Sequence, residues 1–242
     1  MANKKQIAKA AAEAARKAEQ AKIDKRNRVI GIAAVVVVLM LLMGGLAWVR
    51  SNDAAGQASQ VTVSGPTAAS EITEKITHDV VIEVENYGTI KPVLYGETAP
   101  ITVANFAKLA GEGFYDGLTF HRIISGFMIQ GGDPLGNGTG GSEEKIKGEF
   151  SQNGVSNPIP HRRGVLSMAR SSAMDSASSQ FFIMHDVATH LDGAYAAFGC
   201  VTEGIEVVDA ICQNTPVTDS NGTVQKANQP KIISVKVTER AE

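Results

Sequence analysis

Cysteine is nearly absent from this chain of 242 residues, which contains only Cys200 and Cys212. A small secreted domain held together by disulfides needs several cysteine pairs, so the sequence excludes that class. No CxxC pair is present, which excludes a zinc ribbon and a thioredoxin-like redox site. The two cysteines could form one disulfide or remain free thiols, and the sequence leaves both alternatives open.

Several catalytic motifs are also missing. No GxSxG sequence is present, which argues against a serine hydrolase. The five histidines form no HExxH motif, and His185 and His190 have a poor spacing for metal ligands on one helix face. The glycine-rich residues 133–141 lack the GK[ST] ending of a phosphate-binding loop. We therefore expect no metal and no cofactor.

Positive charge is scarce outside the first 28 residues. Residues 1–28 hold nine Lys or Arg against three Asp or Glu, whereas residues 51–242 hold 13 against 22. A nucleic-acid-binding surface needs a basic face for the phosphates, so the acidic main part argues against nucleic acid as a partner.

Residues 29–49 form an uncharged apolar stretch of 21 residues, VIGIAAVVVVLMLLMGGLAWV. A helix of this length spans roughly 30 Å, the hydrocarbon thickness of a bilayer. Trp48 lies at one end, where interfacial aromatics are common, and basic residues flank the other. We predict a transmembrane signal-anchor helix in contact with the lipid bilayer, with the basic residues 1–28 in the cytoplasm.

Cleavage of the apolar stretch is the main alternative, because Gly45-Leu46-Ala47 resembles a signal-peptide cleavage site. Against cleavage, the stretch is longer than a usual signal core, and 28 residues precede it. The small and polar residues 50–73 predict a flexible linker. Residues 74–242 would then form the folded domain.

Short runs of strand-forming residues separated by turns dominate residues 74–242. Apolar residues at helical spacing predict one helix over residues 101–110 and a second over residues 205–212. The expected strands are residues 80–84, 90–95, 119–124, 127–131, 165–168, 181–184, 197–201 and 232–238. This pattern indicates a mainly β domain, a closed barrel whose ends are capped by helices.

A series of sequence blocks carries a resemblance to a known family. The first block is FHRIISGFMIQGGD at residues 120–133, and GNGTGG, GVLSMAR, SSQFFIM, LDGAYAAFG and VTEGIEVVDAI follow in order. In this order and spacing, the blocks resemble the cyclophilins over about residues 76–240. The resemblance implies an eight-stranded antiparallel closed barrel with two capping helices. It also implies cis/trans isomerisation of X-Pro peptide bonds.

The resemblance further implies roles for individual residues. Arg122 corresponds to the catalytic arginine, and Gln130 to a residue that binds the substrate backbone. The apolar seat for the proline ring would be formed by Phe127, Met128, Phe182 and Leu191. The groove for the residues before proline would be lined by Gly138, Ala169, Arg170 and Gln180.

Simple strand alternation does not bring all of these side chains together. Over residues 127–130 it places Met128 and Gln130 on one face of the strand, and Phe127 and Ile129 on the other. Phe127 and Met128 can therefore share a pocket only if the strand twists or ends between them.

Three positions differ from the pattern of many eukaryotic relatives. His190 replaces a tryptophan at a position associated with cyclosporin binding. Tyr195 replaces a pocket histidine and retains an aromatic ring with a polar tip. Arg170 replaces an asparagine. The first two differences are typical of bacterial members, so we expect a bacterial cell membrane protein with its catalytic domain outside the cytoplasm.

The chemistry of X-Pro isomerisation agrees with the missing motifs. The barrier of roughly 20 kcal/mol comes from amide resonance, and no covalent bond has to be made or broken. In the twisted state the prolyl nitrogen gains a lone pair, which a fixed hydrogen-bonding cation such as Arg122 can stabilise. We expect a monomeric enzyme that binds proline-containing polypeptides and assists folding of exported proteins. The alternative is a non-catalytic module that binds proline peptides.

Overall fold

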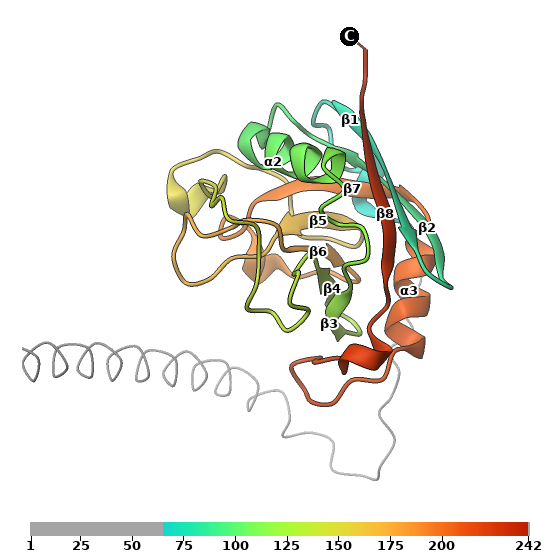
Figure 1. The fold of residues 1–242 in the computed structure, drawn as a ribbon. Coiled ribbons are helices and arrows are strands. Elements are labelled where there is room, and N and C mark those ends of the chain that lie inside the picture. Colours follow the sequence, from blue (N-terminus) through green and yellow to red (C-terminus); the bar gives the residue numbers. More distant parts are fainter. Residues whose placement is uncertain (1–64, 242) are drawn as a thin grey trace, which may run out of the picture. The chain divides into compact units, whose positions relative to one another are not determined.

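The structure is a computed structural model, and it describes residues 65–241. The strands are β1 (His78–Val84), β2 (Gly88–Leu94), β3 (Phe120–Ile124), β4 (Met128–Gly131), β5 (Val165–Met168), β6 (Phe181–Met184), β7 (Ala197–Glu203) and β8 (Ile232–Glu239). The helices are α2 (Pro100–Gly111) and α3 (Ile205–Asn214) (Figure 1). Each strand and helix expected within residues 74–242 is present, with bounds that differ by at most about two residues.

The predicted membrane helix, residues 29–49, lies outside the described residues. Between residues 65 and 241, no helix is both long and apolar enough to cross a bilayer. Part of the expected linker belongs to the folded domain. Ala68 is buried and its backbone N–H donates to the carbonyl of Arg163 at 2.9 Å, so the domain begins before residue 74.

The eight strands form one antiparallel sheet in the order β3-β4-β6-β5-β7-β2-β1-β8, which curls into a half-barrel. The expectation of a closed barrel is wrong, because no strand ladder joins β3 to β8. Only a single bridge, Thr119 with Lys231, pairs the chain just before each of these strands.

A different segment occupies the free edge of β3. Ile123 donates its backbone N–H to the carbonyl of Gly222, and Val224 donates to the carbonyl of His121. Gly222 has a φ of +77°, and a Cβ at this position would lie 2.2 Å from the carbonyl oxygen of Ile123. The left-handed backbone and the lack of a side chain allow this close approach. The loop therefore takes the place that β8 would need to close the barrel.

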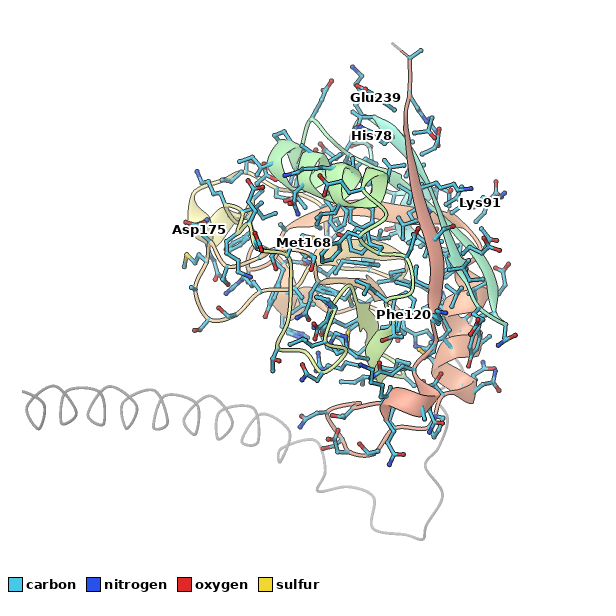
Figure 2. All side chains as sticks on the ribbon, in the orientation of Figure 1. His78, Lys91, Phe120, Met168, Asp175 and Glu239 are labelled. Atoms are coloured by element: carbon cyan, nitrogen blue, oxygen red, sulfur yellow. The ribbon has the colours of Figure 1, made fainter. Side chains whose placement is uncertain are left out.

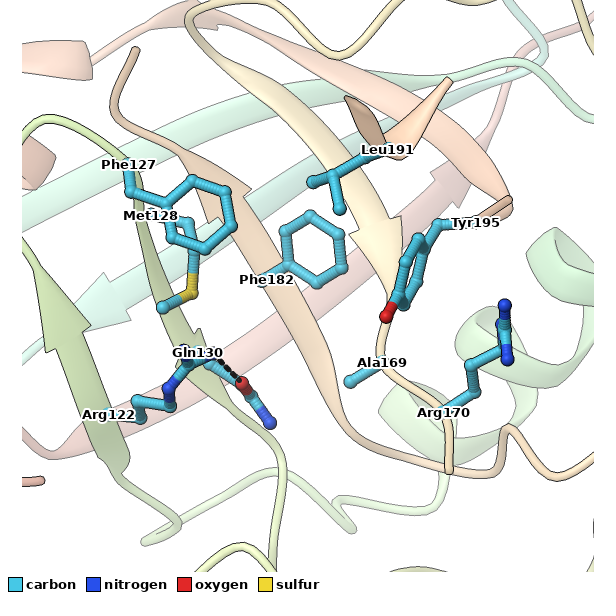
Figure 3. Close-up of a pocket in the computed structure, with 9 residues that line it drawn as sticks. All are labelled: Arg122, Phe127, Met128, Gln130, Ala169, Arg170, Phe182, Leu191 and Tyr195. Atoms are coloured by element: carbon cyan, nitrogen blue, oxygen red, sulfur yellow. Dashed lines mark hydrogen bonds between the residues drawn. The ribbon is translucent and has the colours of Figure 1, made fainter. Parts of the chain in front are cut away.

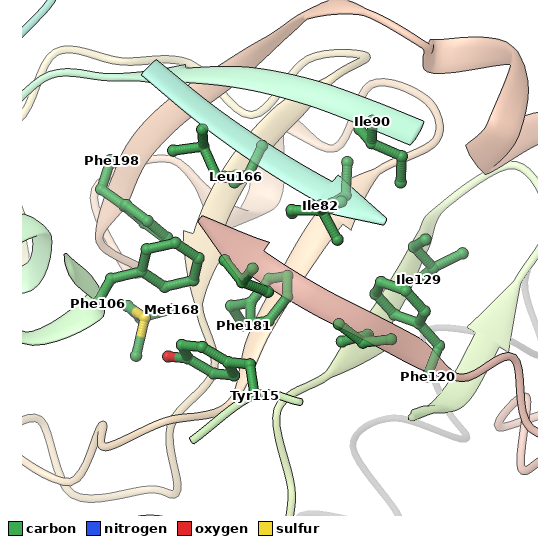
Figure 4. Close-up of a cluster of buried hydrophobic side chains, with 14 of the residues drawn as sticks. Ile82, Ile90, Phe106, Tyr115, Phe120, Ile129, Leu166, Met168, Phe181 and Phe198 are labelled. Atoms are coloured by element: carbon green, nitrogen blue, oxygen red, sulfur yellow. The ribbon is translucent and has the colours of Figure 1, made fainter. Parts of the chain in front are cut away.

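The main core fills the inside of the curled sheet (Figure 4). Phe106 of α2 packs edge-on against Phe181 of β6, with ring centroids 5.4 Å apart, and Tyr115 packs against the same ring at 5.6 Å. Val208 and Ile211 of α3 are fully buried in this core. Both helices thus shield the inner face of the sheet from water.

The outer face of the sheet is also covered along part of its width. Met128, Phe182 and Met184 point to this face and belong to a second apolar cluster, together with Leu191 from a following loop. Their sequence neighbours Ile129, Phe181 and Ile183 belong to the main core instead. Strands β5 and β6 are therefore buried on both faces, which creates an apolar floor on the outside of the half-barrel.

Buried ionic groups connect the helices to the sheet. The Glu149 carboxylate accepts hydrogen bonds from the backbone N–H groups of Ile101 and Thr102, at 3.0 and 2.7 Å, at the beginning of α2. An acceptor here satisfies N–H groups that the helix cannot pair itself. Arg163 forms two hydrogen bonds with Asp209 of α3, at 2.8 and 2.7 Å. Other charged side chains, including Lys91 and Glu239, lie on the outside (Figure 2).

Both cysteines are buried free thiols in the structure. Burial raises the pKa of Cys200 and of Cys212 to about 12. At neutral pH each side chain is therefore protonated and serves as a small apolar core residue.

Three histidines are buried in the domain and make its stability depend on pH. Burial lowers the pKa of His121, His161 and His185 below the ordinary value of 6.5. The unfolded chain binds protons at these histidines near pH 6.5, whereas the folded domain binds them only at lower pH. Their contribution to stability is complete above this value and is lost as the pH falls below it.

We expect the free energy of unfolding of the domain to decrease as the pH is lowered from about 7 to about 5. Urea unfolding at several pH values measures this slope. A free energy that stays constant over this range would contradict the prediction.

Candidate active site

The register of the sheet aligns three side chains, two polar and one apolar, in one row on its outer face. Arg122 of β3 is paired with Gln130 of β4, and Gln130 is paired with Phe182 of β6. Directly paired residues on antiparallel strands place their side chains on the same face, about 5 Å apart. The row continues to Ser167 of β5, which pairs with Phe182.

A pocket of about 140 Å³ opens above this row (Figure 3). Its walls bring together nine of the residues proposed from the sequence: Arg122, Phe127, Met128, Gln130, Ala169, Arg170, Phe182, Leu191 and Tyr195. Apolar side chains form the floor and one wall, and Arg122 with Gln130 forms the opposite edge. An apolar hollow of this size beside one cation suits a small ring next to a group that accepts hydrogen bonds.

Phe127 and Met128 share this pocket because β4 begins between them. Met128 is the first residue of the strand, and Phe127 belongs to the preceding turn. The turn is fixed by His185, whose Nδ1 accepts from the backbone N–H of Gly126 at 2.7 Å. The backbone N–H of His185 also donates to the carbonyl of Phe127 at 2.9 Å. The Phe127 ring is thus held over the pocket without obeying strand alternation.

A chain of hydrogen bonds fixes the position of Arg122. Its Nε donates to the carbonyl of Asn221 at 2.8 Å, and its Nη1 donates to Oε1 of Gln130 at 3.2 Å. Gln130 in turn donates to Oε1 of Gln180 at 2.9 Å, and Gln180 donates to the carbonyl of Gly140 at 2.7 Å. A guanidinium carries five N–H groups, so donors remain for a ligand in the pocket.

Burial lowers the pKa of Arg122 from its ordinary value. A guanidinium titrates so far above neutral pH that the side chain remains a cation. Half-buried beside an apolar wall, its charge is screened less than a fully solvated charge would be. The site therefore holds a fixed, oriented positive charge against an apolar surface.

A buried histidine supports the aromatic wall from behind. The His161 ring stacks on Phe182, with centroids 6.0 Å apart, and meets Tyr195 edge-on at 6.5 Å. Its Nδ1 lies 3.0 Å from Oδ1 of Asp192, and its Nε2 lies 2.9 Å from Oγ of Ser167. Because burial keeps the ring neutral, Nδ1–H donates to the carboxylate and Nε2 accepts from the serine hydroxyl.

Arg170 acts on the pocket through the ring of Tyr195. Its guanidinium carbon lies 4.7 Å from the centre of the Tyr195 ring and 5.0 Å from that of Phe150. Its Nε donates to the carbonyl of Ala194 at 3.0 Å. The cation is held between two aromatic faces, an arrangement that stabilises the Tyr195 ring. Figure 3 shows Arg170 beside Tyr195, on the side of that ring away from Phe182.

The other three residues proposed from the sequence lie outside this pocket. Gly138 and Gln180 line an adjoining hollow of about 260 Å³, which shares Gln130, Ala169 and Arg170 with the pocket. His190 is exposed and stacks on Phe127, with ring centroids 5.8 Å apart.

Sequence reasoning missed the supporting residues of the site. His161 and Ser167 are buried beneath the pocket, Asp192 is exposed beside Leu191, and no motif connects the three. Asn221 orients Arg122 through its backbone carbonyl, and a contact made by the backbone cannot be predicted from the residue type. The block LDGAYAAFG indicated the loop that carries Tyr195, but it did not reveal that Asp192 pairs with His161.

Comparisons with known proteins agree with this geometry. The family model described as cyclophilin type peptidyl-prolyl cis-trans isomerase/CLD matches residues 79–237. Peptidyl-prolyl cis-trans isomerase B of Bacillus subtilis is 49% identical over 143 residues, which cover 59% of this chain and 91% of that protein. A peptidyl-prolyl cis-trans isomerase of Synechococcus elongatus is 50% identical over 119 residues, covering 49% of this chain and 77% of that protein.

A solved structure is similar over the whole domain. The crystal structure of a Cryptosporidium parvum cyclophilin type isomerase in the presence of the dipeptide Ala-Pro has a TM-score of 0.59 and 32% identity. It covers 67% of this chain, and 99% of the solved chain is matched. The family match, the identities and the curled eight-stranded sheet agree with one another. The chain belongs to the cyclophilin family, and its domain is a peptidyl-prolyl cis-trans isomerase.

Proposed function

We propose that residues 29–49 hold this isomerase at a bacterial cell membrane, where the monomeric domain acts outside the cytoplasm on proline-containing segments of exported polypeptides. The observation that carries the site assignment is the apolar pocket with Arg122 fixed at its edge. The membrane position is supported by the apolar stretch and the basic residues before it. The relatives in Bacillus subtilis and Synechococcus elongatus support a bacterial setting.

The apolar seat binds the proline ring. Met128, Phe182 and Leu191 are almost fully buried, and each exposes only a small surface to the pocket. A proline ring that covers this surface releases water and is held in one orientation. The part of the peptide on the other side of the X-Pro bond remains free to rotate.

Arg122 stabilises the twisted amide. In a planar amide the nitrogen lone pair is delocalised and accepts no strong hydrogen bond. When the bond rotates, that lone pair localises on the prolyl nitrogen and can accept an N–H from the guanidinium. Because Arg122 is already oriented by Gln130 and Asn221, little reorganisation is needed during the reaction. This interaction is stronger in the transition state than in either planar form, which is the requirement for catalysis.

Gln130 and Gln180 prepare the groove for the substrate backbone. Their amides are linked by the 2.9 Å hydrogen bond, so each has a defined orientation. Ala169 adds no bulk between the pocket and the adjoining hollow. We assign the residues before proline to this side of the site.

Replacing Arg122 with alanine is expected to lower kcat/KM for an X-Pro peptide by about 100-fold or more, the usual cost of losing a donor that stabilises a transition state. Arg122→Lys should recover only part of the activity, because an ammonium lacks the planar array of donors. A protease-coupled or NMR exchange assay measures the rates. The exposed Arg240→Ala is the matched control. Equal rates for Arg122→Ala and the unchanged protein would favour the non-catalytic binding module.

Replacing His161 with alanine is expected to raise KM about tenfold and to change kcat less. The substitution removes the common support of Phe182 and Tyr195, so the ring seat loosens while Arg122 keeps its own hydrogen bonds. A tenfold change corresponds to about 1.4 kcal/mol. Circular dichroism first selects a temperature at which the variant is folded. An unchanged KM in the folded variant would refute this role of His161.

The membrane assignment predicts the behaviour of the full chain in bacteria. The full chain should sediment with membranes and resist alkaline extraction, and deletion of residues 29–49 should release it. Added protease should degrade the domain in spheroplasts without lysis. N-terminal sequencing distinguishes the anchor from a cleaved signal, which would leave a mature chain that begins after Ala47. A full-length chain in the cytosolic fraction would disprove the assignment.

A further inference from the structure

A second hollow adjoins the proline pocket at Arg122. It has a volume of about 640 Å³ and shares Arg122 and Gln130 with the pocket. We call it the Lys226 hollow; the other lining side chains used below are those of His121, Asn137, Asn221 and Lys226. Of these four residues, only Asn221 has a part in the isomerisation, through the backbone carbonyl that orients Arg122.

The Lys226 hollow presents hydrogen-bond donors that the domain does not use. Within residues 65–241, the Lys226 ammonium has no hydrogen bond or ion pair. Asn137 accepts at Oδ1 from the backbone N–H and the hydroxyl of Thr139, which leaves its amide N–H groups for another partner. Arg122 contributes a second cation at the edge shared with the pocket.

His121 is a buried polar group without a partner at the same hollow. The side chain is 4% exposed, and neither ring nitrogen has a hydrogen-bond partner among the described residues. A buried polar group that remains unpaired costs free energy, so such positions call for a ligand or solvent. Burial lowers the pKa of His121, so the neutral ring offers one donor and one acceptor.

The acidic groups nearest the hollow are already occupied. The Asp133 carboxylate accepts from the backbone N–H groups of Leu135, Asn137 and Gly138 at 2.6 to 3.1 Å. Asp219 accepts from the backbone N–H groups of Asn221 and Thr223 at 2.9 and 3.1 Å. These carboxylates are directed at the backbone of their own loops. Both carboxylates keep their charge, and Asp219 attracts the Arg122 guanidinium, but among the described residues neither carboxylate forms an ion pair with Arg122 or Lys226.

Three hollows meet at Gln130. The Gly138–Gln180 hollow adjoins the proline pocket at Ala169 and Arg170, the Lys226 hollow adjoins it at Arg122, and these two hollows also meet each other at Gly138. The two different edges of the proline pocket give a direction to an extended peptide. Residues before proline are assigned above to the side of Ala169. The chain after proline then continues past Arg122, and one residue advances it by about 3.3 Å. The first or second residue after proline reaches the Lys226 hollow.

We propose that the Lys226 hollow is a specificity subsite for a carboxylate side chain, Asp or Glu, in the first two positions after proline. This inference rests on the proposed function, because it takes the direction of the substrate from it. Lys226 and Arg122 supply the charge, and the Asn137 and Asn221 amides supply neutral donors. The long Lys and Arg side chains can form charge-assisted hydrogen bonds with a carboxylate.

The test compares peptides that differ only in Glu or Gln at the first or second position after proline. For the full chain, the ratio of kcat/KM between the Glu and Gln peptides should be about three to five at low salt, the size expected of a partly exposed charge pair. The ratio should decrease as salt is added. The same exchange placed before proline measures the separate effect of Lys145 and Arg170, and Lys226→Gln should leave that ratio unchanged.

Two lysine variants locate the effect. Because Arg122 remains, Lys226→Gln should lower the Glu/Gln ratio towards one, and Lys226→Glu should lower it further. Lys145→Gln is the matched control, because Lys145 lines the hollow on the other side of the pocket, and it should keep the ratio. A ratio of one in the unchanged protein, or a ratio that Lys226→Gln leaves unchanged, would overturn the subsite.

Failure of the subsite and failure of the proposed function give different results. Turnover of the Gln peptides by the unchanged protein establishes isomerase activity whatever the ratio is. If no peptide is turned over, the proposed function fails. Binding of the same Glu and Gln peptides, followed by fluorescence anisotropy, then still decides whether Lys226 selects the carboxylate.

Discussion

The antiparallel register of β3, β4 and β6 is the constraint on which the rest of the site depends. It pairs Arg122 with Gln130 and Gln130 with Phe182, and so places a cation, an amide and an aromatic ring on the same face. A slip of one residue would turn β4 over, exposing Ile129 and burying Gln130 in the apolar core. The tight packing of Phe181 and Ile183 on the inner face opposes such a slip. The inner core therefore determines the order of groups on the outer surface.

The packing on the two sides of the sheet differs in kind. Inside, the curled strands enclose aromatic and aliphatic side chains with help from α2 and α3. Outside, the loop that carries Leu191 and Tyr195 is attached by His161 and by the guanidinium of Arg170. The outer contacts are more polar and more directional, because they position a few side chains and do not exclude water from a large volume. This division lets the same strands serve stability on one face and recognition on the other.

Much of the fold could be predicted from the sequence, because local patterns encode strands and helices. Strand composition and turn residues predicted the strands to within about two residues. The pocket residues were predicted by the resemblance to the cyclophilins, and the structure brings nine of them together around one pocket. Closure of the barrel could not be predicted, since it depends on how the loop around Gly222 competes with β8 for the edge of β3. That Phe127 and Met128 share a pocket could not be predicted either, because it depends on where β4 begins. The support by His161 required three segments to meet in space, which no local pattern records.

The position of the pocket on the outside of an open sheet has a consequence for the form of substrate that the domain can accept. Since the hollow faces outward and is shallow, a polypeptide can approach it sideways, and no chain end has to be threaded through an opening. A proline in the middle of a long chain is therefore as accessible as one near a terminus. A small recess of about 140 Å³ has room for little beyond the proline ring, so the flanking chain must lie extended across the surface. The conformation of the chain at the proline, and not the length of the polypeptide, then limits which substrates the domain accepts.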